Sequence, residues 1–312
     1  MQTNVEISVM MSVYNPDSRQ YFRESVRSIL SQTFQEWELI LYDDGSEEPY
    51  ASVIREMAMA DRRIRYCRSE ENRGLARSMN VCSGMARGRY LARMDADDIS
   101  RPERLQRMYE FLESHPEYDW VGCNTELIRE DGVWGTRLMP EVPDRKDFLR
   151  YSPYIHPSVM FRREVLTESG GYRPMHRGED YELFMRLHAA GKRGYNLQEF
   201  YFQYREDDNT YRRRKYRYRI EEVRIRKEGF QRLKILNVRT CFSVIKPLIV
   251  GLVPRGLLFR IKLRVRKEMH VERLTESKTR KIHGISGKKP GFAPVGTDTG
   301  GGRAEREDLF SG

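Results

Sequence analysis

Apolar and polar positions near the start of the chain follow two different periodicities. Residues 7–13 (ISVMMSV) form a largely apolar run, as expected for a strand buried on both faces of a parallel sheet. Over residues 22–30 the apolar side chains recur every three or four positions, which predicts an amphipathic helix. A second apolar run, residues 37–42, predicts another strand, and residues 49–60 a second helix.

This alternation continues to about residue 115. A short strand is predicted near residues 64–67, a helix over residues 75–85, and a strand that begins at Tyr90. Residues 100–103 (SRPE) have the form of a helix-capping box, so a helix is predicted to start there and to end at residues 115–116 (HP). Alternating strands and helices favour an α/β fold with a mostly parallel central sheet and flanking helices.

The pattern is more mixed in the second half. Strands are predicted at residues 120–123 and 195–204, a hairpin turn at residues 131–132, and a helix over residues 180–190. A basic, helical C-terminal extension follows, and the last residues are dominated by glycine, lysine and proline. We expect an α/β domain over residues 1–205, the basic extension over residues 206–275, and a disordered tail over residues 276–312.

Composition indicates a rather polar globular protein and excludes one that spans membranes, with 39% hydrophobic and 33% charged residues. The four cysteines lack the spacing of a zinc site or a disulfide framework, and no secretory signal pattern is visible, so we expect a cytoplasmic protein. The formal net charge is +10, and residues 233–270 contain nine basic residues and one acid. This uneven charge predicts contact with an anionic surface.

Residues 244–267 combine apolar side chains with arginine and lysine. Their longest apolar stretch, residues 248–253, is far shorter than the roughly 20 residues that span a bilayer. Pro247 and Pro254 are expected to divide the segment further. It resembles segments that lie at a membrane surface, so we expect an anionic membrane at the inner face of the cell as a partner. The alternative is an arm that packs on the rest of the chain or on a second subunit.

Two clusters of carboxylates each follow a predicted strand. Asp43 and Asp44 end one strand, and Asp95, Asp97 and Asp98 follow another. Ligands of an open parallel sheet bind beyond the carboxyl ends of its strands, so both clusters should meet at one site. Such oxygen ligands suit Mg²⁺ or Mn²⁺, whose other ligands are often substrate phosphates. The alternative is that Asp98 caps the next helix while the other acids face solvent.

Other motifs for phosphate or metal do not fit the chain. An EF-hand loop would need a glycine after its acids, but Ile99 follows them here, and neither a P-loop nor a helix-opening G-x-G-x-x-G is present. A phosphatase with an aspartyl-phosphate intermediate would have Thr or Val at position 99 and its motif at the first strand. These classes are excluded.

Five segments occur in an order typical of one enzyme family. They are SVYNP (12–16), LYDDGS (41–46), NRGLARSMN (72–80), GRYLARMDADDISRPERL (88–105) and GEDYELFMRL (178–187). Together they resemble the family 2 glycosyltransferases, which have the nucleotide-binding GT-A fold, most of all bacterial members that build surface polysaccharides. The resemblance covers about residues 5–204. It implies transfer from a nucleotide-diphosphate sugar, with Mn²⁺ or Mg²⁺ as cofactor.

The resemblance also implies roles for individual residues. Asp43, the first acid of the DDGS segment, is expected to contact the nucleotide base, and Asn15 lies where the first strand meets the nucleotide. Asp95 is expected near the ribose and the metal, and Asp97 as a direct metal ligand. Asp180 occupies the position of the catalytic base. Members of this kind often use UDP-sugars, so a UDP-sugar donor and a glycan or lipid-linked acceptor are expected.

The expected chemistry agrees with this assignment. An attacking acceptor hydroxyl must lose its proton, which calls for a carboxylate base. Asp180 begins a predicted helix, whose dipole favours the ionised form. A single displacement would invert the anomeric carbon. Glu179 is the second candidate for the base. The structural alternative for Asp180 is that it is an ordinary helix N-cap. His156, which is next to a proline, is expected to be structural.

Two other functions are alternatives. A sugar-nucleotide nucleotidyltransferase would also bind a nucleotide and a metal. In a different class, residues 204–219 alternate aromatic residues with arginines, as in modules that stack bases and bind phosphates. Acids at positions 206–208 and in the upstream clusters oppose that function, so nucleic acid is not expected as a partner.

Overall fold

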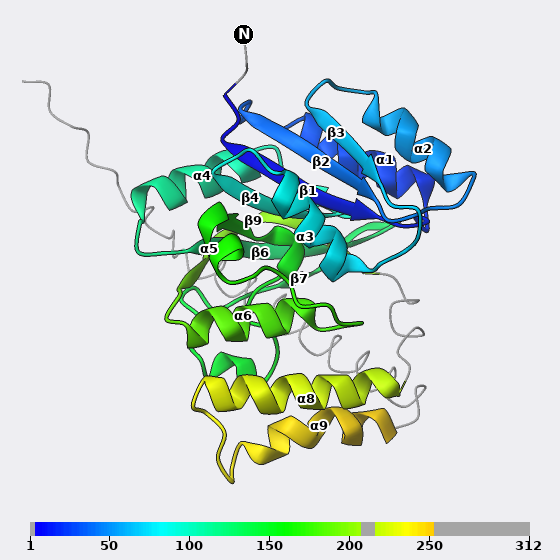
Figure 1. Cartoon of the computed structure of the whole chain (residues 1–312). Coiled ribbons are helices and arrows are strands. Elements are labelled where there is room, and N and C mark those ends of the chain that lie inside the picture. The colour runs from blue at the N-terminus through cyan, green and yellow to red at the C-terminus, as the bar shows by residue number, and fades with distance from the viewer. Residues whose placement is uncertain (1–3, 207–215, 253–312) are drawn as a thin grey trace, which may run out of the picture. The chain divides into compact units, whose positions relative to one another are not determined.

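The computed structural model describes residues 4–206 and 216–252 of the 312-residue chain. A central sheet carries helices on both faces (Figure 1). The strands are β1 Ile7–Val13, β2 Trp37–Asp43, β3 Ile64–Arg68, β4 Tyr90–Asp95, β5 Ile99–Ser100, β6 Trp120–Arg129, β7 Gly132–Arg137, β8 Met160–Arg162 and β9 Gly194–Arg205. The helices are α1 Arg19–Leu30, α2 Tyr50–Ala58, α3 Leu75–Met85, α4 Arg104–Ser114, α5 Arg163–Glu168, α6 Glu179–Ala189, α8 Arg217–Arg232 and α9 Cys241–Leu252.

The strands lie in the order β3-β2-β1-β4-β8-β6-β9-β5, with β7 paired to β6. The first four are parallel and are joined by α1, α2 and α3. Beyond β4 the sheet becomes mixed, because β8 runs antiparallel to both β4 and β6 while β6 and β9 are parallel. The predicted α/β fold with a mostly parallel central sheet and flanking helices is confirmed.

The two faces of the sheet are covered by different helices. Apolar residues of β1 alternate between them, so that Val9 and Met11 pack with α1, α2 and α4, whereas Met10 packs on the side of α3 and α6. Burial on both faces explains why the N-terminal strands read as continuous apolar runs. It also leaves the ends of the strands as the places where polar groups can gather.

The register of β1 with its neighbours places two of the predicted acids at one edge. Val13 of β1 pairs with Asp43 of β2, and Ser12 pairs with Asp95 of β4. Adjacent strands are about 4.8 Å apart, so Asp43 and Asp95 lie on the order of 10 Å from each other across β1. The structure thus brings the two acidic clusters to the same carboxyl edge of the sheet.

The predicted capping box of α4 is wrong. Ser100 lies in β5, and α4 begins only at Arg104. The side chain of Gln32 fulfils the capping role instead: its Oε1 accepts a hydrogen bond from the Leu105 N–H (3.0 Å), and its Nε2 donates to the Arg101 carbonyl (2.8 Å). Because this cap is brought from the end of α1 by the tertiary fold, the local S-x-x-E pattern could not reveal it.

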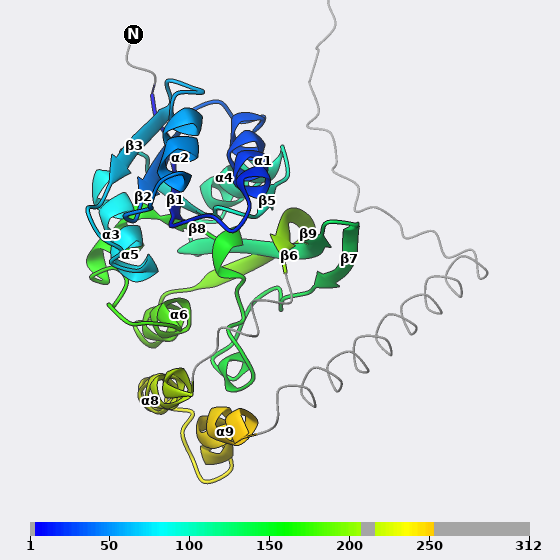
Figure 2. The same ribbon diagram turned by 90° about the vertical axis from the view of Figure 1, so that its right-hand side faces the viewer.

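Helix α8 packs along α6 and shares its core, as both views show (Figures 1 and 2). Phe230 of α8 is buried in the same cluster as Phe184 of α6. Gly229 permits the close approach, since a Cβ there would lie 2.3 Å from the Met185 sulfur. The predicted helical extension therefore begins as part of the same compact unit as the sheet. The division of the chain at residue 205 stays a prediction.

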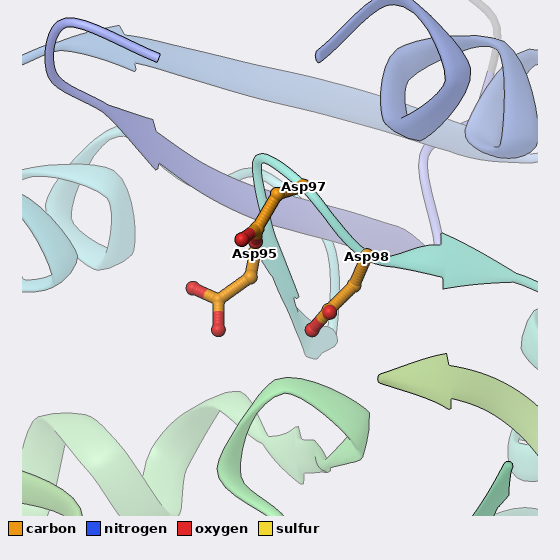
Figure 3. Close-up of side chains that lie close together, drawn as sticks. All are labelled: Asp95, Asp97 and Asp98. Atoms are coloured by element: carbon orange, nitrogen blue, oxygen red, sulfur yellow. The ribbon is translucent and has the colours of Figure 1, made fainter. Parts of the chain in front are cut away.

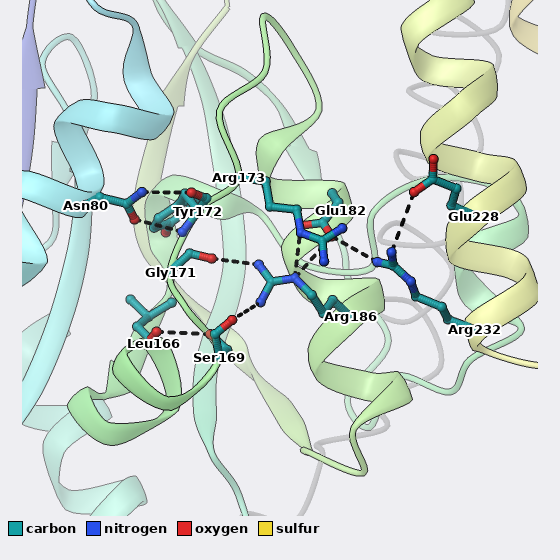
Figure 4. Close-up of polar contacts among 10 residues, drawn as sticks. All are labelled: Asn80, Leu166, Ser169, Gly171, Tyr172, Arg173, Glu182, Arg186, Glu228 and Arg232. Carbon is teal, nitrogen blue, oxygen red and sulfur yellow. Dashed lines mark hydrogen bonds and ion pairs between the residues drawn. The ribbon is translucent and has the colours of Figure 1, made fainter.

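A buried polar cluster also connects α6 to its neighbours (Figure 4). Glu182 of α6 forms ion pairs with Arg173 (3.1 Å), Arg186 (3.1 Å) and Arg232 of α8 (3.2 Å). Arg186 also donates to two backbone carbonyls in the loop before α6 (2.6 Å each). These contacts fix the first turns of α6 against both α8 and that loop.

Helix α9 continues through Pro247, where the sequence predicted a break. A proline in a helix leaves the carbonyl four residues earlier without its donor. Here Arg226 of α8 donates to that carbonyl, on Ser243 (3.4 Å), which compensates for the loss. In the described part of the chain no helix has the length and apolar character needed to cross a membrane. The predicted tail, and residues 253–267 of the predicted membrane-surface segment, lie outside the described residues.

Candidate active site

Three aspartates gather where β4 ends (Figure 3). Asp95 is the last residue of β4, and Asp97 and Asp98 lie in the short connection to β5. One carboxylate oxygen from each residue lies within 4.8 Å of the others. Asp98 is buried, Asp95 is half-buried and Asp97 is exposed, so the cluster forms the inner wall of an open site.

The residues of this aspartate cluster fit a divalent cation. Burial and the neighbouring carboxylates of Asp97 and Asp95 raise the pKa of Asp98 well above its usual range. The Oδ2 atom of Asp98 is buried without a hydrogen-bond partner among the described residues. A hard cation such as Mn²⁺ or Mg²⁺ would supply the missing positive charge and accept these oxygen ligands.

Arg205, the last residue of β9, holds the connection that carries the cluster. Its backbone N–H donates to Asp98 Oδ1 (2.7 Å), and its Nε donates to the Asp97 carbonyl (2.8 Å). Its guanidinium also pairs with Glu24 of α1 (3.0 Å) and stacks over the Tyr21 ring (3.7 Å). The sequence analysis missed this residue, because only the antiparallel pairing of β9 with β5 brings it to the site.

Asp43 lies at the predicted edge of the sheet, but other groups of the protein already bind its carboxylate. Its carboxylate has no exposed surface; it accepts from the Ser46 N–H (2.8 Å) and the Tyr66 hydroxyl (3.1 Å), and Arg68 Nε lies 3.5 Å away. Asp44 accepts from the backbone N–H groups of Arg73 and Gly74 (3.0 and 2.8 Å) and so holds the loop that leads into α3. The contact of Asp43 with a nucleotide base stays a prediction.

Asn15 joins the loops that follow β1 and β2. Its backbone has a φ of 39°, a left-handed conformation that asparagine tolerates better than most residues. Its Oδ1 accepts from the Glu47 N–H (2.8 Å), and its own N–H donates to Ser46 Oγ (3.0 Å). Gly45 allows the loop to pass close by, since a Cβ there would lie 2.6 Å from the backbone of Glu71. A contact between Asn15 and the nucleotide stays a prediction.

Asp180 lies in the first turn of α6, after Gly178, whose φ of 80° sets the entry into the helix. Gly178 is the N-cap, so the alternative in which Asp180 caps the helix is wrong. Burial raises the pKa of Asp180, although a hydrogen bond from the Tyr181 N–H acts in the opposite direction. Burial and the Asp180 charge raise the pKa of the adjacent Glu179 to about 7. Both carboxyls at the start of α6 therefore ionise less readily than they would in water.

The two groups of acids act on each other electrostatically. The negative charge of Asp95 and the positive charge of Arg93, both on β4, act on Asp180 and on Glu179. The end of β4 and the start of α6 therefore form one electrostatic unit, although they are far apart in the sequence. Arg93 was missed by the sequence analysis.

His156 lies in the core, as expected. Its Nε2 is 2.8 Å from the hydroxyl of Tyr172, and both side chains are buried. Burial holds the pKa of His156 well below its usual range, so the ring stays neutral at physiological pH. A neutral histidine fixed by Tyr172 is a structural element behind the site.

Comparison with known proteins identifies the family. The family model described as "Glycosyl transferase family 2" matches residues 8–184. The chain belongs to glycosyltransferase family 2. The matched residues include the carboxylates at the ends of β2 and β4 and at the start of α6, and the family assignment favours neither the nucleotidyltransferase nor the nucleic-acid alternative.

Several relatives resemble this family 2 glycosyltransferase over most of its length. It is 36% identical over 264 residues to the Bacillus subtilis protein named "Putative glycosyltransferase EpsE", which covers 83% of this chain and 94% of that one. It is 27% identical over 271 residues to an Escherichia coli UDP-Gal:alpha-D-GlcNAc-diphosphoundecaprenol beta-1,3-galactosyltransferase, covering 83% and 97%. The Erwinia amylovora amylovoran biosynthesis glycosyltransferase AmsE is 30% identical over 240 residues, covering 75% and 88%.

Solved structures confirm that the fold is GT-A. The S. aureus protein TarS (residues 1–349), crystallised with UDP-GlcNAc, superposes with a TM-score of 0.61 at 16% identity, over 78% of this chain and 72% of TarS. The mannosyltransferase PcManGT from Pyrobaculum calidifontis, in complex with GDP-Man and Mn²⁺, gives a TM-score of 0.55 at 16% identity, covering 85% and 81%.

Proposed function

We propose that this family 2 glycosyltransferase is an inverting, metal-dependent enzyme of surface polysaccharide synthesis. It would transfer a sugar from a nucleotide-diphosphate sugar to a glycan or lipid-linked acceptor. The observation that carries the proposal is the convergence of the aspartate cluster at the end of β4 with the Glu179–Asp180 pair at the start of α6, where the Asp95 charge acts on Asp180. In this proposal one site contains both a cation-binding set and a candidate base.

Each part of the reaction has a candidate residue. Asp97 and Asp95 would hold Mn²⁺ or Mg²⁺, and the bound cation would neutralise charge that develops on the departing diphosphate. Asp43 and Asn15 would hold the nucleotide at the neighbouring strand ends. Asp180, when ionised, would accept the proton of the acceptor hydroxyl as its oxygen attacks the anomeric carbon. A single attack opposite the leaving diphosphate inverts that carbon.

A UDP-sugar is the proposed donor. The named E. coli relative uses UDP-Gal, and TarS was crystallised with UDP-GlcNAc. The diphosphoundecaprenol acceptor in the name of that relative supports a lipid-linked acceptor for this chain, and the biosynthetic role named for AmsE supports surface polysaccharide as the product. PcManGT binds GDP-Man together with Mn²⁺, which supports the cation and makes a GDP-sugar the first alternative donor to test.

A panel of nucleotide sugars tests the proposed function. Purified protein should bind and slowly hydrolyse at least one of UDP-glucose, UDP-galactose, UDP-GlcNAc or GDP-mannose when Mn²⁺ or Mg²⁺ is present, and much less so after chelation with EDTA. Nuclear magnetic resonance of a transfer product should show an inverted anomeric configuration. Release of pyrophosphate from a nucleoside triphosphate and a sugar phosphate would instead identify a nucleotidyltransferase. Equal activity with and without metal would contradict the cation requirement.

The proposed location is the inner face of the cell membrane, with α9 as the contact. Its outer face presents Phe242, Ile245 and Ile249, which are 60%, 42% and 44% exposed, and Val238 just before the helix is 94% exposed. No acid occurs in residues 233–252, whereas Lys234, Arg239 and Lys246 are exposed around this face. Apolar side chains ringed by basic ones suit the headgroup layer of an anionic membrane.

Vesicle binding by surface variants tests this location. Residues 241–252 cannot simply be removed, because Val244 and Pro247 are buried in the core. We expect that a Phe242→Ser, Ile245→Ser, Ile249→Ser triple variant loses most of its co-sedimentation with phosphatidylglycerol-rich vesicles at low salt. A Met59→Ser, Val133→Ser double variant, which alters equally exposed apolar residues elsewhere, should bind like the unaltered protein. Equal binding by the triple variant would contradict the role of α9.

A further inference from the structure

Arg93 is a charged residue in the interior of the sheet, directly behind the site. It lies on β4, between the apolar neighbours Ala92 and Met94, and its side chain is only 2% exposed. A buried guanidinium is expensive unless it is paired. Its burial also rules out direct contact with a substrate in the open site, so a role for Arg93 must act through other residues.

The charged partner of this guanidinium is a predicted metal ligand. Arg93 Nη1 lies 2.5 Å from Asp95 Oδ2, while the Asp95 side chain remains 31% exposed. The carboxylate therefore has one oxygen bound from the interior and a surface still open to the site. The buried Nε and Nη1 of Arg93 make no hydrogen bond of regular geometry among the described residues, which leaves the ion pair with Asp95 as the main compensation for the guanidinium charge.

The positive charge of Arg93 also acts on the other acids of the site. Arg93 opposes the rise in pKa of Asp97, Asp98, Glu179 and Asp180. His156, which lies nearby in the core, stays neutral and supplies no second positive charge. One buried guanidinium thus compensates acids on β4, on the following connection and on α6.

We propose that Arg93 is a positioning residue: it orients the Asp95 carboxylate toward the divalent cation. The inference rests on the proposed metal-dependent transfer and adds to it a residue that acts from behind the metal ligands. Ligand carboxylates are themselves commonly held by such partners, and loss of one typically lowers metal affinity about 10–100-fold.

Electrostatics alone would predict the opposite effect on the metal. Removing a positive charge beside a cation site strengthens cation binding if the ligands stay in place. Weaker binding after loss of Arg93 therefore reports lost orientation of Asp95, whereas tighter binding reports a charge without a positioning role. The sign of the change in Mn²⁺ affinity therefore separates a positioning role of Arg93 from a purely electrostatic one.

A matched control exists in Arg104 of α4, which is also fully buried. Its guanidinium donates to the carbonyls of Arg93 (2.7 Å) and Pro157 (3.2 Å), and it forms no ion pair with the site acids among the described residues. Loss of Arg104 should disturb the core to a similar extent without releasing Asp95. Arg93→Lys retains a charge but lacks the planar fork that holds a carboxylate.

The experiment measures Mn²⁺ affinity in donor-free protein from the electron paramagnetic resonance signal of free Mn²⁺. Arg93→Met should bind Mn²⁺ about 10–100-fold more weakly, Arg93→Lys should lie between it and the unaltered protein, and Arg104→Met should change affinity less than threefold. Thermal unfolding verifies that each variant is folded.

Two results would overturn the inference. One is unchanged or tighter Mn²⁺ binding by Arg93→Met, and the other is equal weakening by Arg93→Met and Arg104→Met. If Arg93→Met is unfolded, Arg93→Lys carries the test, and Mn²⁺ affinity equal to that of the unaltered protein would then count against the inference. Absence of Mn²⁺ binding by the unaltered protein would instead contradict the proposed metal site itself, and with it the role of Arg93.

Discussion

Asp180→Asn should lower turnover by roughly 10²–10⁴-fold, the usual contribution of a general base, while donor binding changes little. The amide has nearly the same size and lies in the same first turn of α6, but it cannot take a proton from the acceptor hydroxyl. Gly178 provides the N-cap, so the substitution does not remove a helix cap. Steady-state kinetics with a chosen acceptor, together with calorimetry of donor binding, gives both quantities.

Glu179→Gln provides the matched control. Glu179 is half-buried like Asp180 and its pKa is also raised, but we assign it no proton transfer. We expect Glu179→Gln to reduce turnover less than tenfold. If Asp180→Asn lowers turnover less than tenfold and Glu179→Gln lowers it a hundredfold or more, the base is Glu179. Comparable small losses from both would place the base outside this pair.

The N-terminal half of the fold could be predicted because its strands are buried on both faces. A short apolar run such as Ile7–Val13, ended by a polar turn, is typical of a buried parallel strand, and the helix Leu75–Met85 has clear ends at Gly74 and Ala86. What could not be predicted depends on distant partners. The cap of α4 comes from Gln32, and the predicted basic helix after residue 205 packs Ile225 and Phe230 into the core, which its composition did not indicate.

The residues of the candidate site also fall into those that the sequence could predict and those that it could not. Asp43 and Asp95 could be placed because acids directly after parallel strands must lie at one edge, and the register across β1 confirms it. Arg205 reaches the site only through the pairing of β9 with β5, which no local pattern indicates. Arg93 did leave a signal: a charged residue inside an apolar strand, buried on both faces, requires a partner close by.

Asp97→Ala should abolish the Mn²⁺-dependent part of donor affinity while the protein stays folded. A metal that neutralises a diphosphate contributes several kcal/mol, so loss of a direct ligand should weaken metal-dependent binding by roughly a hundredfold or more. The protein should stay folded because Asp97 is exposed at the open side of the aspartate cluster, where removal of its carboxylate leaves no cavity. Calorimetric titration of UDP-sugar with and without Mn²⁺ measures the effect.

The controls separate a metal ligand from a nearby charge. Asp131→Ala removes an equally exposed carboxylate from the turn between β6 and β7 and should leave Mn²⁺-dependent binding intact. Asp97→Asn keeps the shape of the side chain but not its charge, and a hard cation prefers the carboxylate, so its affinity should fall nearly as far as that of Asp97→Ala. Because one oxygen of each aspartate lies within 4.8 Å of the others, Asp95 and Asp98 remain to hold a cation in these variants. If folded Asp97→Ala retained the full Mn²⁺ dependence of donor binding, those two carboxylates would form the metal site and Asp97 would lie outside it.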